Sequence, residues 1–432
     1  MNEPLLPHQM AWPPNTPHAE ARDRALRILT VGNMYPPHHA GGYEFAWQRA
    51  VHHARSLGHQ VRVLVTDYHT DEANTDDDPD VHRTLRWYWD LDHYEFPRLN
   101  AVQRLGLERH NATELRRHLK EFRPDLIAWW SMGCMSLSLI EQARRVGLPA
   151  VFVVHDDWLG YGWEHDQWIR MWQGPRRGRV APVAERILRI PTRVEVNRAG
   201  CFVFNSNYTL QRAREVRLTT PRVSVVHPGI DETFLEPLEQ QPWHWRLAYV
   251  GRVDRQKGID TAVKAVSALP PETTLTVWGS GDDRYIDEMR RLSEQLGLAD
   301  RVQFKGFVES SQLRAAYAAA DAVVFPVRWN EPFGLVPLEA MGVQRPVVTT
   351  STGGISEFVR NGENAMVFAV DDSTAMADCI TRLARDRELR NKLRAGGVQT
   401  ARRFTASRSA ERTVSEMLRA MSREVPETQS RP

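Results

Sequence analysis

The chain has 432 residues, of which 42% are hydrophobic and 25% are charged, a composition that excludes a disordered or fibrous protein. With 56 basic and 54 acidic side chains the formal net charge is +2, so the overall charge gives no indication of a nucleic-acid partner. The length exceeds one ordinary core and predicts two domains of roughly 200 residues each.

Three cysteines lie far apart and are odd in number, so they fit neither a disulfide framework nor a metal site and indicate a reducing cytoplasm. Residues 1–25 are rich in proline and lack the apolar core of a signal peptide, which predicts a disordered tail. The most apolar run, residues 126–140, is shorter than the roughly 20 residues of a membrane span. We therefore expect a cytoplasmic protein without a transmembrane anchor.

Short apolar or β-branched runs bounded by turn residues recur along the chain, with helix-length amphipathic segments between most of them. In the first half they are residues 28–31, 61–65, 126–130, 150–154, 202–204 and 223–226. After a linker at 227–245 the pattern begins again at residues 247–250, 275–278, 302–304, 323–325 and 346–349. Apolar strands that alternate with helices predict parallel sheets covered on both faces.

This organisation predicts an α/β protein of two Rossmann-like, doubly wound domains that face each other across a cleft. We place the first domain at residues 26–235, the second at 245–403, and at 404–425 a helix that packs back on the first domain. Ligands of such sheets bind at the carboxyl ends of the strands, so the chemistry is expected on the loops that follow strands.

The loop after the first strand contains the paired glycines Gly41 and Gly42 and leads directly into a helix. Paired glycines let a backbone approach a ligand, and a helix N-terminus offers free N–H groups to an anion. A glycine-rich turn without a ligand would show the same pattern, so this signal is weak by itself.

In the second domain, the first strand ends in the loop GRVDRQKG, and a helix begins at Ile259. Arg252 and Lys257 lie five residues apart at this carboxyl end, where their charges can bind a diphosphate and neutralise a departing one. A solvated pair of surface cations is the alternative.

The segment EPFGLVPLE carries two carboxylates, Glu331 in a loop and Glu339 just over one turn into the helix that begins near Leu335. They do not share a helical face, so we interpret them as two hydrogen-bond acceptors along one extended ligand. The amides from Phe333 to Leu335 lie at the helix N-terminus and suit a phosphate. An acidic loop followed by a solvated helix face is the alternative.

Taken together, the motifs resemble those of glycosyltransferase family 4, a retaining family with the GT-B fold. The matching segments are GGYE (41–44), VVHDDW (153–158), FNSNYT (204–209), VVHPGID (225–231), YVGRVDRQKGID (249–260), WGSGDD (278–283), EPFGLVPLE (331–339) and TGGISEFVRNGENAMVF (352–368). They run in order through most of the chain, which makes the resemblance highly specific.

The resemblance implies a role for each matching residue. The catalytic set would be His155, Arg252, Lys257 and Glu331. Arg252 and Lys257 would bind the donor diphosphate, Glu331 the hydroxyls of the transferred sugar, and His155 would line the reaction centre. The expected donor contacts are Gly41, Gly42, Arg252, Lys257, Gly279, Glu331, Phe333, Gly334, Leu335 and Glu339, the last holding the nucleotide ribose.

For the acceptor we assign Tyr43, Asp156, Trp158 and Trp163. The last three lie in the segment DDWLGYGWEHDQWIRMWQ, which is rich in flat aromatic faces that suit sugar rings or another apolar acceptor. Packing of an irregular insert is the alternative. The basic stretch 175–198, with interleaved aliphatic residues, suits either an anionic membrane surface or an acceptor phosphate. An exposed arginine-rich helix without a partner is equally compatible.

The prediction is a bacterial hexosyltransferase that uses a UDP- or GDP-sugar and retains anomeric configuration, with the leaving phosphate helping to deprotonate the acceptor. Its acceptor would be a sugar, a lipid-linked compound or a small molecule. No tightly bound cofactor, no required metal and no nucleic acid are expected, and the oligomeric state is open. The alternatives are a sugar-nucleotide epimerase or a phosphorylase of the same fold, and a non-catalytic sugar-binding protein.

Overall fold

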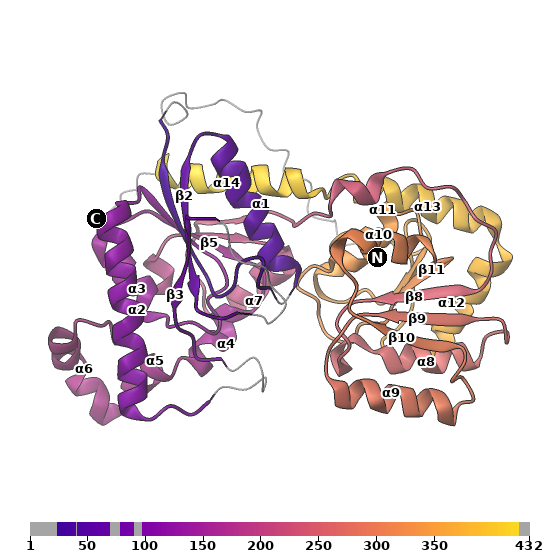
Figure 1. The fold of residues 1–432 in the computed structure, drawn as a ribbon, viewed down its shortest axis with the longest axis horizontal. Helices are drawn as coiled ribbons and strands as arrows, with labels where there is room; N and C mark the ends of the chain where they lie inside the picture. The colour runs from indigo at the N-terminus through magenta and orange to yellow at the C-terminus, as the bar shows by residue number, and fades with distance from the viewer. Residues whose placement is uncertain (1–23, 40, 70–77, 90–96, 423–432) are drawn as a thin grey trace, which may run out of the picture.

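The computed structural model describes residues 24–39, 41–69, 78–89 and 97–422. In these residues the chain folds into two domains, each a parallel β-sheet with helices on both faces (Figure 1). This confirms the predicted α/β class. The predicted tail at 1–25 lies outside the described residues except for residues 24 and 25, and so does the end of the chain from 423 onward.

The first domain is built on a seven-stranded sheet of order β3-β2-β1-β4-β5-β6-β7, in which every pair is parallel. Its strands are β1 (Arg27–Val31), β2 (Gln60–Thr66), β3 (Val81–Leu85), β4 (Leu126–Trp129), β5 (Ala150–Val154), β6 (Cys201–Phe204) and β7 (Val223–Val225). Its helices are α1 (Gly42–Ser56), α2 (Ala101–Phe122), α3 (Ser138–Val146), α4 (Trp158–His165), α5 (Gln167–Trp172), α6 (Pro175–Leu188) and α7 (Asn207–Glu215).

The second domain is built on a six-stranded sheet of order β10-β9-β8-β11-β12-β13, again with parallel pairs. Its strands are β8 (Arg246–Val250), β9 (Thr274–Trp278), β10 (Val302–Gly306), β11 (Ala322–Phe325), β12 (Val347–Thr349) and β13 (Met366–Val367). Its helices are α8 (Ile259–Ser267), α9 (Asp283–Gln295), α10 (Ser310–Ala318), α11 (Leu335–Gly342), α12 (Ser373–Arg385) and α13 (Arg387–Ala401), with 3₁₀ turns η4 (Arg255–Lys257) and η5 (Gly353–Glu357).

Strand order reverses direction between β1 and β4 in the first sheet and between β8 and β11 in the second. Such a reversal opens a crevice at the carboxyl edge of an open α/β sheet, and this crevice is where ligands bind. The loops after β1, β8 and β11 therefore hold the sites that the sequence singled out.

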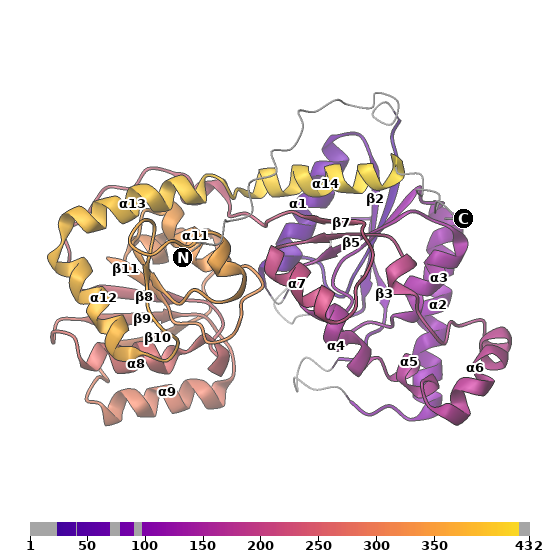
Figure 2. The ribbon, with the colours of Figure 1, turned by 180° about the vertical axis from the view of Figure 1, so that it is seen from behind.

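Helix α14 (Ala406–Ser422) continues from the second domain and lies along the first (Figures 1 and 2). It packs on α1 and contacts β4, β5 and β6, and its Val414 and Met417 are buried in the core cluster that α1 shares with the first sheet. Where this segment crosses the linker, a Cβ on Gly229 would lie 2.1 Å from the carbonyl of Thr405. Glycine is needed there because two backbones touch.

Among the described residues, no helix combines the length and the apolar composition needed to cross a membrane.

The buried face of α14 generates a stability prediction. Replacing Met417 by alanine leaves a cavity in the first domain, so we expect the free energy of unfolding of that domain to fall by about 2–5 kcal/mol in urea titrations. Ser415→Ala, at an exposed position of the same helix, is the control. Equal effects of the two substitutions would show that α14 does not contribute to that core.

Candidate active site between the domains

Two helix N-termini meet where the domains face each other. Helix α1 begins at Gly42 and α11 begins at Leu335, and a Cβ on Gly42 would lie 3.4 Å from Leu335 Cδ1. The Gly41 N–H donates to Glu44 Oε2 at 3.1 Å, which holds the glycine loop against the first turn of α1. Both helices carry partial positive charge at these ends, so the junction favours an anion such as a phosphate.

Lys257 and Glu331 form an ion pair next to this junction. Their side chains are only 13% and 8% exposed, and the indole N–H of Trp329 donates to the same oxygen of Glu331 at 2.8 Å. Lys257 ends η4, whose N-terminus is capped by Asp254, and Gly258 at φ +69° lets this turn press against the carbonyl of Pro326 after β11. The structure thus brings together two of the four predicted catalytic residues.

Arg252 precedes this pair in the β8 loop and is 54% exposed, with its Nε 2.6 Å from Asp254 Oδ2. Gly279, in the loop after β9, has φ +141°, and a Cβ there would lie 1.9 Å from the carbonyl of Gly251. The neighbouring β8 and β9 loops can therefore approach each other only because residue 279 is glycine. Arg252 therefore lies at the surface of this loop region, with its guanidinium paired to Asp254.

Glu339 lies deeper, within α11, and accepts a hydrogen bond from the Tyr317 hydroxyl at 2.6 Å. Burial raises its pKa, while this hydrogen bond and the charge of Arg49 from the opposite domain act in the other direction. A carboxylate with one oxygen held by Tyr317 is well oriented to accept hydrogen bonds from the hydroxyls of a ligand.

On the side of the first domain, residues around the end of β5 line the candidate site. The Tyr43 ring lies 4.6 Å from that of His155, and its hydroxyl donates to the carbonyl of Val153 at 2.9 Å. Burial lowers the pKa of His155 to about 3, so this imidazole is neutral at physiological pH. Asp156 accepts a hydrogen bond from the Tyr161 hydroxyl at 2.6 Å, and burial raises the pKa of Asp156 to about 6.

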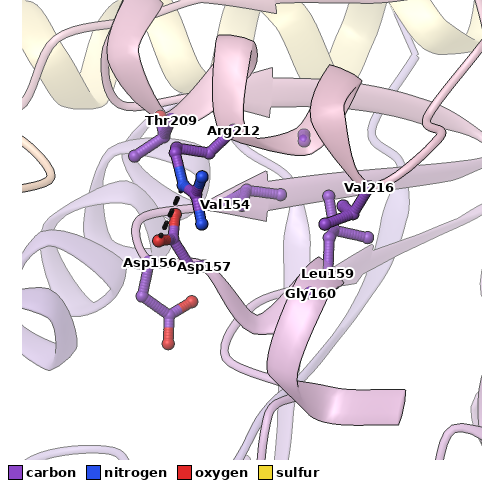
Figure 3. Close-up of a pocket in the computed structure, with 9 residues that line it drawn as sticks. Val154, Asp156, Asp157, Leu159, Gly160, Thr209, Arg212 and Val216 are labelled. Carbon is purple, nitrogen blue, oxygen red and sulfur yellow. Dashed lines mark ion pairs between the residues drawn. The ribbon is translucent and has the colours of Figure 1, made fainter. Parts of the chain in front are cut away.

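Figure 3 shows how the two consecutive aspartates after β5 diverge. Asp157 points to Arg212 of α7, with its Oδ2 3.5 Å from Nε, whereas Asp156 points away from this pair. The cavity between α4 and α7 that they border holds about 20 Å³, the space of one water molecule. Asp157 therefore links α4 to α7, and Asp156 is the aspartate left for other contacts.

The tryptophans assigned to the acceptor behave differently from one another. Trp158 is 0% exposed and packs against Phe152 in the core, so its faces are covered by protein and we do not keep it in the acceptor site. Trp163 is half-buried and lines a separate cavity of 390 Å³ with Val194, Val216 and Leu218. The tryptophan-rich segment forms α4 and α5, and helix periodicity turns Trp158 and Trp168 inward.

Sequence reasoning did not identify Glu357, which joins the two domains. Its carboxylate accepts hydrogen bonds from Asn207 Nδ2 at 2.9 Å, from the Tyr208 backbone N–H at 3.0 Å, and from His227 Nε2 at 2.8 Å. Burial acts to raise the pKa of Glu357, but these donors outweigh it, and the pKa lies below its usual value. The only prior signal was that Glu357 falls within the motif TGGISE.

The same turn supports the loop of Glu331. Gly353 and Gly354 pack so closely on this loop that a Cβ would lie 2.3 Å from the Glu331 carbonyl and 2.2 Å from the Pro332 carbonyl, respectively. From the first domain, the Ser206 hydroxyl donates to that same Pro332 carbonyl. The position of Glu331 is therefore coupled, through η5, to the contact between the domains.

Among the described residues, no group of three or more histidine, cysteine, aspartate or glutamate side chains is arranged to hold a metal ion. The expectation that no metal is required stays a prediction.

Two family models match consecutive parts of the chain: Glycosyltransferase Family 4 over residues 40–234 and Glycosyl transferases group 1 over residues 235–400. The D-inositol 3-phosphate glycosyltransferase of Corynebacterium glutamicum (strain R) is 33% identical over 208 residues, which cover 44% of this chain and 50% of the relative. The enzyme of the same name from Xylanimonas cellulosilytica is 36% identical over 200 residues, covering 42% and 48%. The chain thus spans about half the length of these curated relatives.

Among solved structures, Anabaena HepE in complex with UDP superimposes with a TM-score of 0.64 at 19% identity, covering 91% of this chain and all of HepE. Sucrose-phosphate synthase from Thermosynechococcus elongatus gives a TM-score of 0.68 at 18% identity, covering 92% of this chain and 99% of that enzyme. At these identities the likeness shows the fold, which is GT-B.

The contacts of Glu357 generate a prediction for domain closure. Glu357→Gln removes the negative charge from three hydrogen bonds, so we expect the closed arrangement to lose about 2 kcal/mol and the radius of gyration in small-angle scattering to rise. The contacts lower the pKa of Glu357 in the folded protein. The extra stability that ionised Glu357 gives the closed arrangement is therefore complete above the pKa of an unfolded glutamate, about 4.3, and is lost as the pH falls through the lowered pKa of Glu357. Glu363→Gln, at an exposed position, is the control. A radius of gyration unchanged by Glu357→Gln at neutral pH would contradict this role.

Proposed function

We propose that this chain, which belongs to the family 4 glycosyltransferases, transfers a hexosyl group from a UDP- or GDP-linked sugar to a hydroxyl or other nucleophilic acceptor, with retention. The observation that carries the proposal is the buried Lys257–Glu331 pair beside the meeting N-termini of α1 and α11. This arrangement offers an anion site and a carboxylate side by side, as a diphosphate attached to a sugar requires.

The donor diphosphate would lie at the junction of the two helices. Free N–H groups at Gly42 and Leu335, together with Arg252 and Lys257, would neutralise its charge, and they would stabilise the additional charge that develops as the diphosphate leaves. In the absence of donor, Glu331 supplies the counter-charge of Lys257. Donor phosphate would take over that role and free Glu331 to accept hydrogen bonds from the sugar hydroxyls.

The nucleoside would extend along α11 toward Glu339. Tyr317 holds one oxygen of this carboxylate, and the other can accept from the ribose hydroxyls. UDP and UDP-glucose are ligands of the structurally similar HepE, which supports UDP-sugars as the first donors to test.

Retention would follow if attack and departure occur on the same face of the sugar. The bond from C1 to the phosphate oxygen breaks, the acceptor oxygen bonds to C1, and the acceptor proton passes to the departing phosphate. On the first domain, His155, which is neutral, and Asp156 follow β5, and the His155 ring contacts that of Tyr43 at the start of α1. We assign His155 to line the sugar, and Asp156, with Tyr43, to orient the acceptor hydroxyl.

The test of the reaction class is to incubate the purified chain with UDP- and GDP-hexoses and to measure binding by calorimetry and slow donor hydrolysis by product analysis. Binding of at least one donor with release of the nucleoside diphosphate supports the proposal. No binding and no release across the panel would refute it.

A charge prediction concerns the donor site. We expect Lys257→Met and Glu331→Gln each to lower kcat for donor turnover on the order of 10²-fold, because each removes a group that acts on charge developing in the transition state. Lys305→Met removes an exposed lysine of the same domain and is the matched control. Unchanged kcat in the Lys257 and Glu331 variants would place the chemistry elsewhere.

A pH prediction concerns the acceptor site. If ionised Asp156 orients the acceptor, kcat/KM for the acceptor falls as the pH drops through about 6, because protonation removes the accepting charge. Asp156→Asn should lower kcat/KM at pH 8 and abolish this pH step, whereas Asp157→Asn should keep the step. A step of the same midpoint in Asp156→Asn would assign it to another group.

A further inference from the structure

Helix α6 presents an exposed aliphatic stripe. Val180, Val183 and Ile187 are 54%, 61% and 74% exposed, and their spacing of three and four residues puts them on one face of the helix. Figures 1 and 2 show α6 at the periphery of the first domain, on the side remote from the second domain. The stripe is therefore separate from the site between the domains.

The opposite face of α6 fixes the helix to the domain. Glu185 accepts hydrogen bonds from the N–H and the hydroxyl of Thr192, both at 2.9 Å, and forms an ion pair with Arg145 at 2.5 Å. Ala181 is buried on the same side. The aliphatic stripe is thus presented outward by a helix whose inward face is already engaged.

Positive charge surrounds the stripe. Arg176, Arg179 and Arg186 are exposed and, at 100° per residue, fall on or beside the face of the three aliphatic residues. Arg177 is exposed on the other flank of the stripe. The one acidic residue of α6, Glu185, faces inward, so the outward face carries cations and aliphatic side chains without an anion.

We propose that this outward face of α6, defined by residues 176, 179, 180, 183, 186 and 187, docks on an anionic lipid surface. Short aliphatic side chains can enter the boundary between headgroups and acyl chains while the arginines bind lipid phosphates, and the two contributions add. The first domain would then be held against the membrane by α6, independently of the chemistry proposed for the cleft.

Two other partners fit the surface less well. A second copy of the chain would need roughly 1,200 Å² of buried surface for a stable contact, and three aliphatic side chains on one helix supply only a fraction of that. A nucleic acid would be bound by the arginines, but Val180, Val183 and Ile187 would then be pressed against phosphates, where apolar groups contribute nothing.

The experiment is flotation of the full chain with phosphatidylcholine vesicles, with and without phosphatidylglycerol. We expect binding to the anionic vesicles, weaker binding as salt is added, and little binding to phosphatidylcholine alone. Replacing Val180, Val183 and Ile187 together by serine should lower the partition coefficient at least about tenfold. Replacing Arg176, Arg179 and Arg186 together by glutamine should lower it about a hundredfold and remove the preference for anionic vesicles.

Two matched control variants each replace three side chains of the same kind at exposed positions outside α6. One replaces the exposed Val102, Leu296 and Val370 by serine, and the other replaces the exposed Arg402, Arg408 and Arg412 by glutamine. Both should bind anionic vesicles like the wild type. Equal losses of vesicle binding in the α6 and control variants, or no vesicle binding by the wild type, would overturn the proposal. So would a wild type that does not bind vesicles but self-associates or binds oligonucleotides through α6. Melting curves would verify that each variant is folded.

Discussion

The arrangement of the site depends on the carboxylate of Glu357, which belongs to the second domain and accepts hydrogen bonds from the first. Glu357 accepts three hydrogen bonds from α7 and from the start of the linker, and its lowered pKa keeps it ionised at neutral pH. Hydrogen bonds to a charged group are stronger than neutral ones, so this contact is a substantial part of what closes the cleft. Separating the domains would leave a carboxylate without its donors, and this cost opposes opening.

The contact between the domains is linked to the loop of Glu331 through the turn η5. Glu357 ends the turn η5, whose glycines Gly353 and Gly354 lie directly against the carbonyls of Glu331 and Pro332. Because a side chain at either glycine would collide with this loop, η5 and the Glu331 loop must move together. The Lys257–Glu331 pair lies within the second domain, and its loop is linked through η5 to the contact with α7. The meeting of the helix N-termini of α1 and α11 depends on how the two domains are placed.

The sequence predicted the parts of this structure that depend on local pattern. Fully buried strands such as β5 were found because an uninterrupted apolar run has few other interpretations, whereas β3 was missed because its VHRTL sequence is polar and mostly half-buried. Lys257 and Glu331 were both identified, but their pairing across 74 residues is a property of the folded chain. Trp158 was assigned to a ligand because composition does not reveal which faces of a helix turn inward.

We infer that a nucleoside diphosphate binds where α1 and α11 meet, and a crystal structure of the chain with UDP or GDP would test this inference. We expect the diphosphate within hydrogen-bond distance of the amides at Gly42 or Leu335 and of the Lys257 ammonium, with the ribose at Glu339. A diphosphate bound elsewhere, such as in the 430 Å³ groove beside Tyr285, Met289 and Arg291, would contradict it.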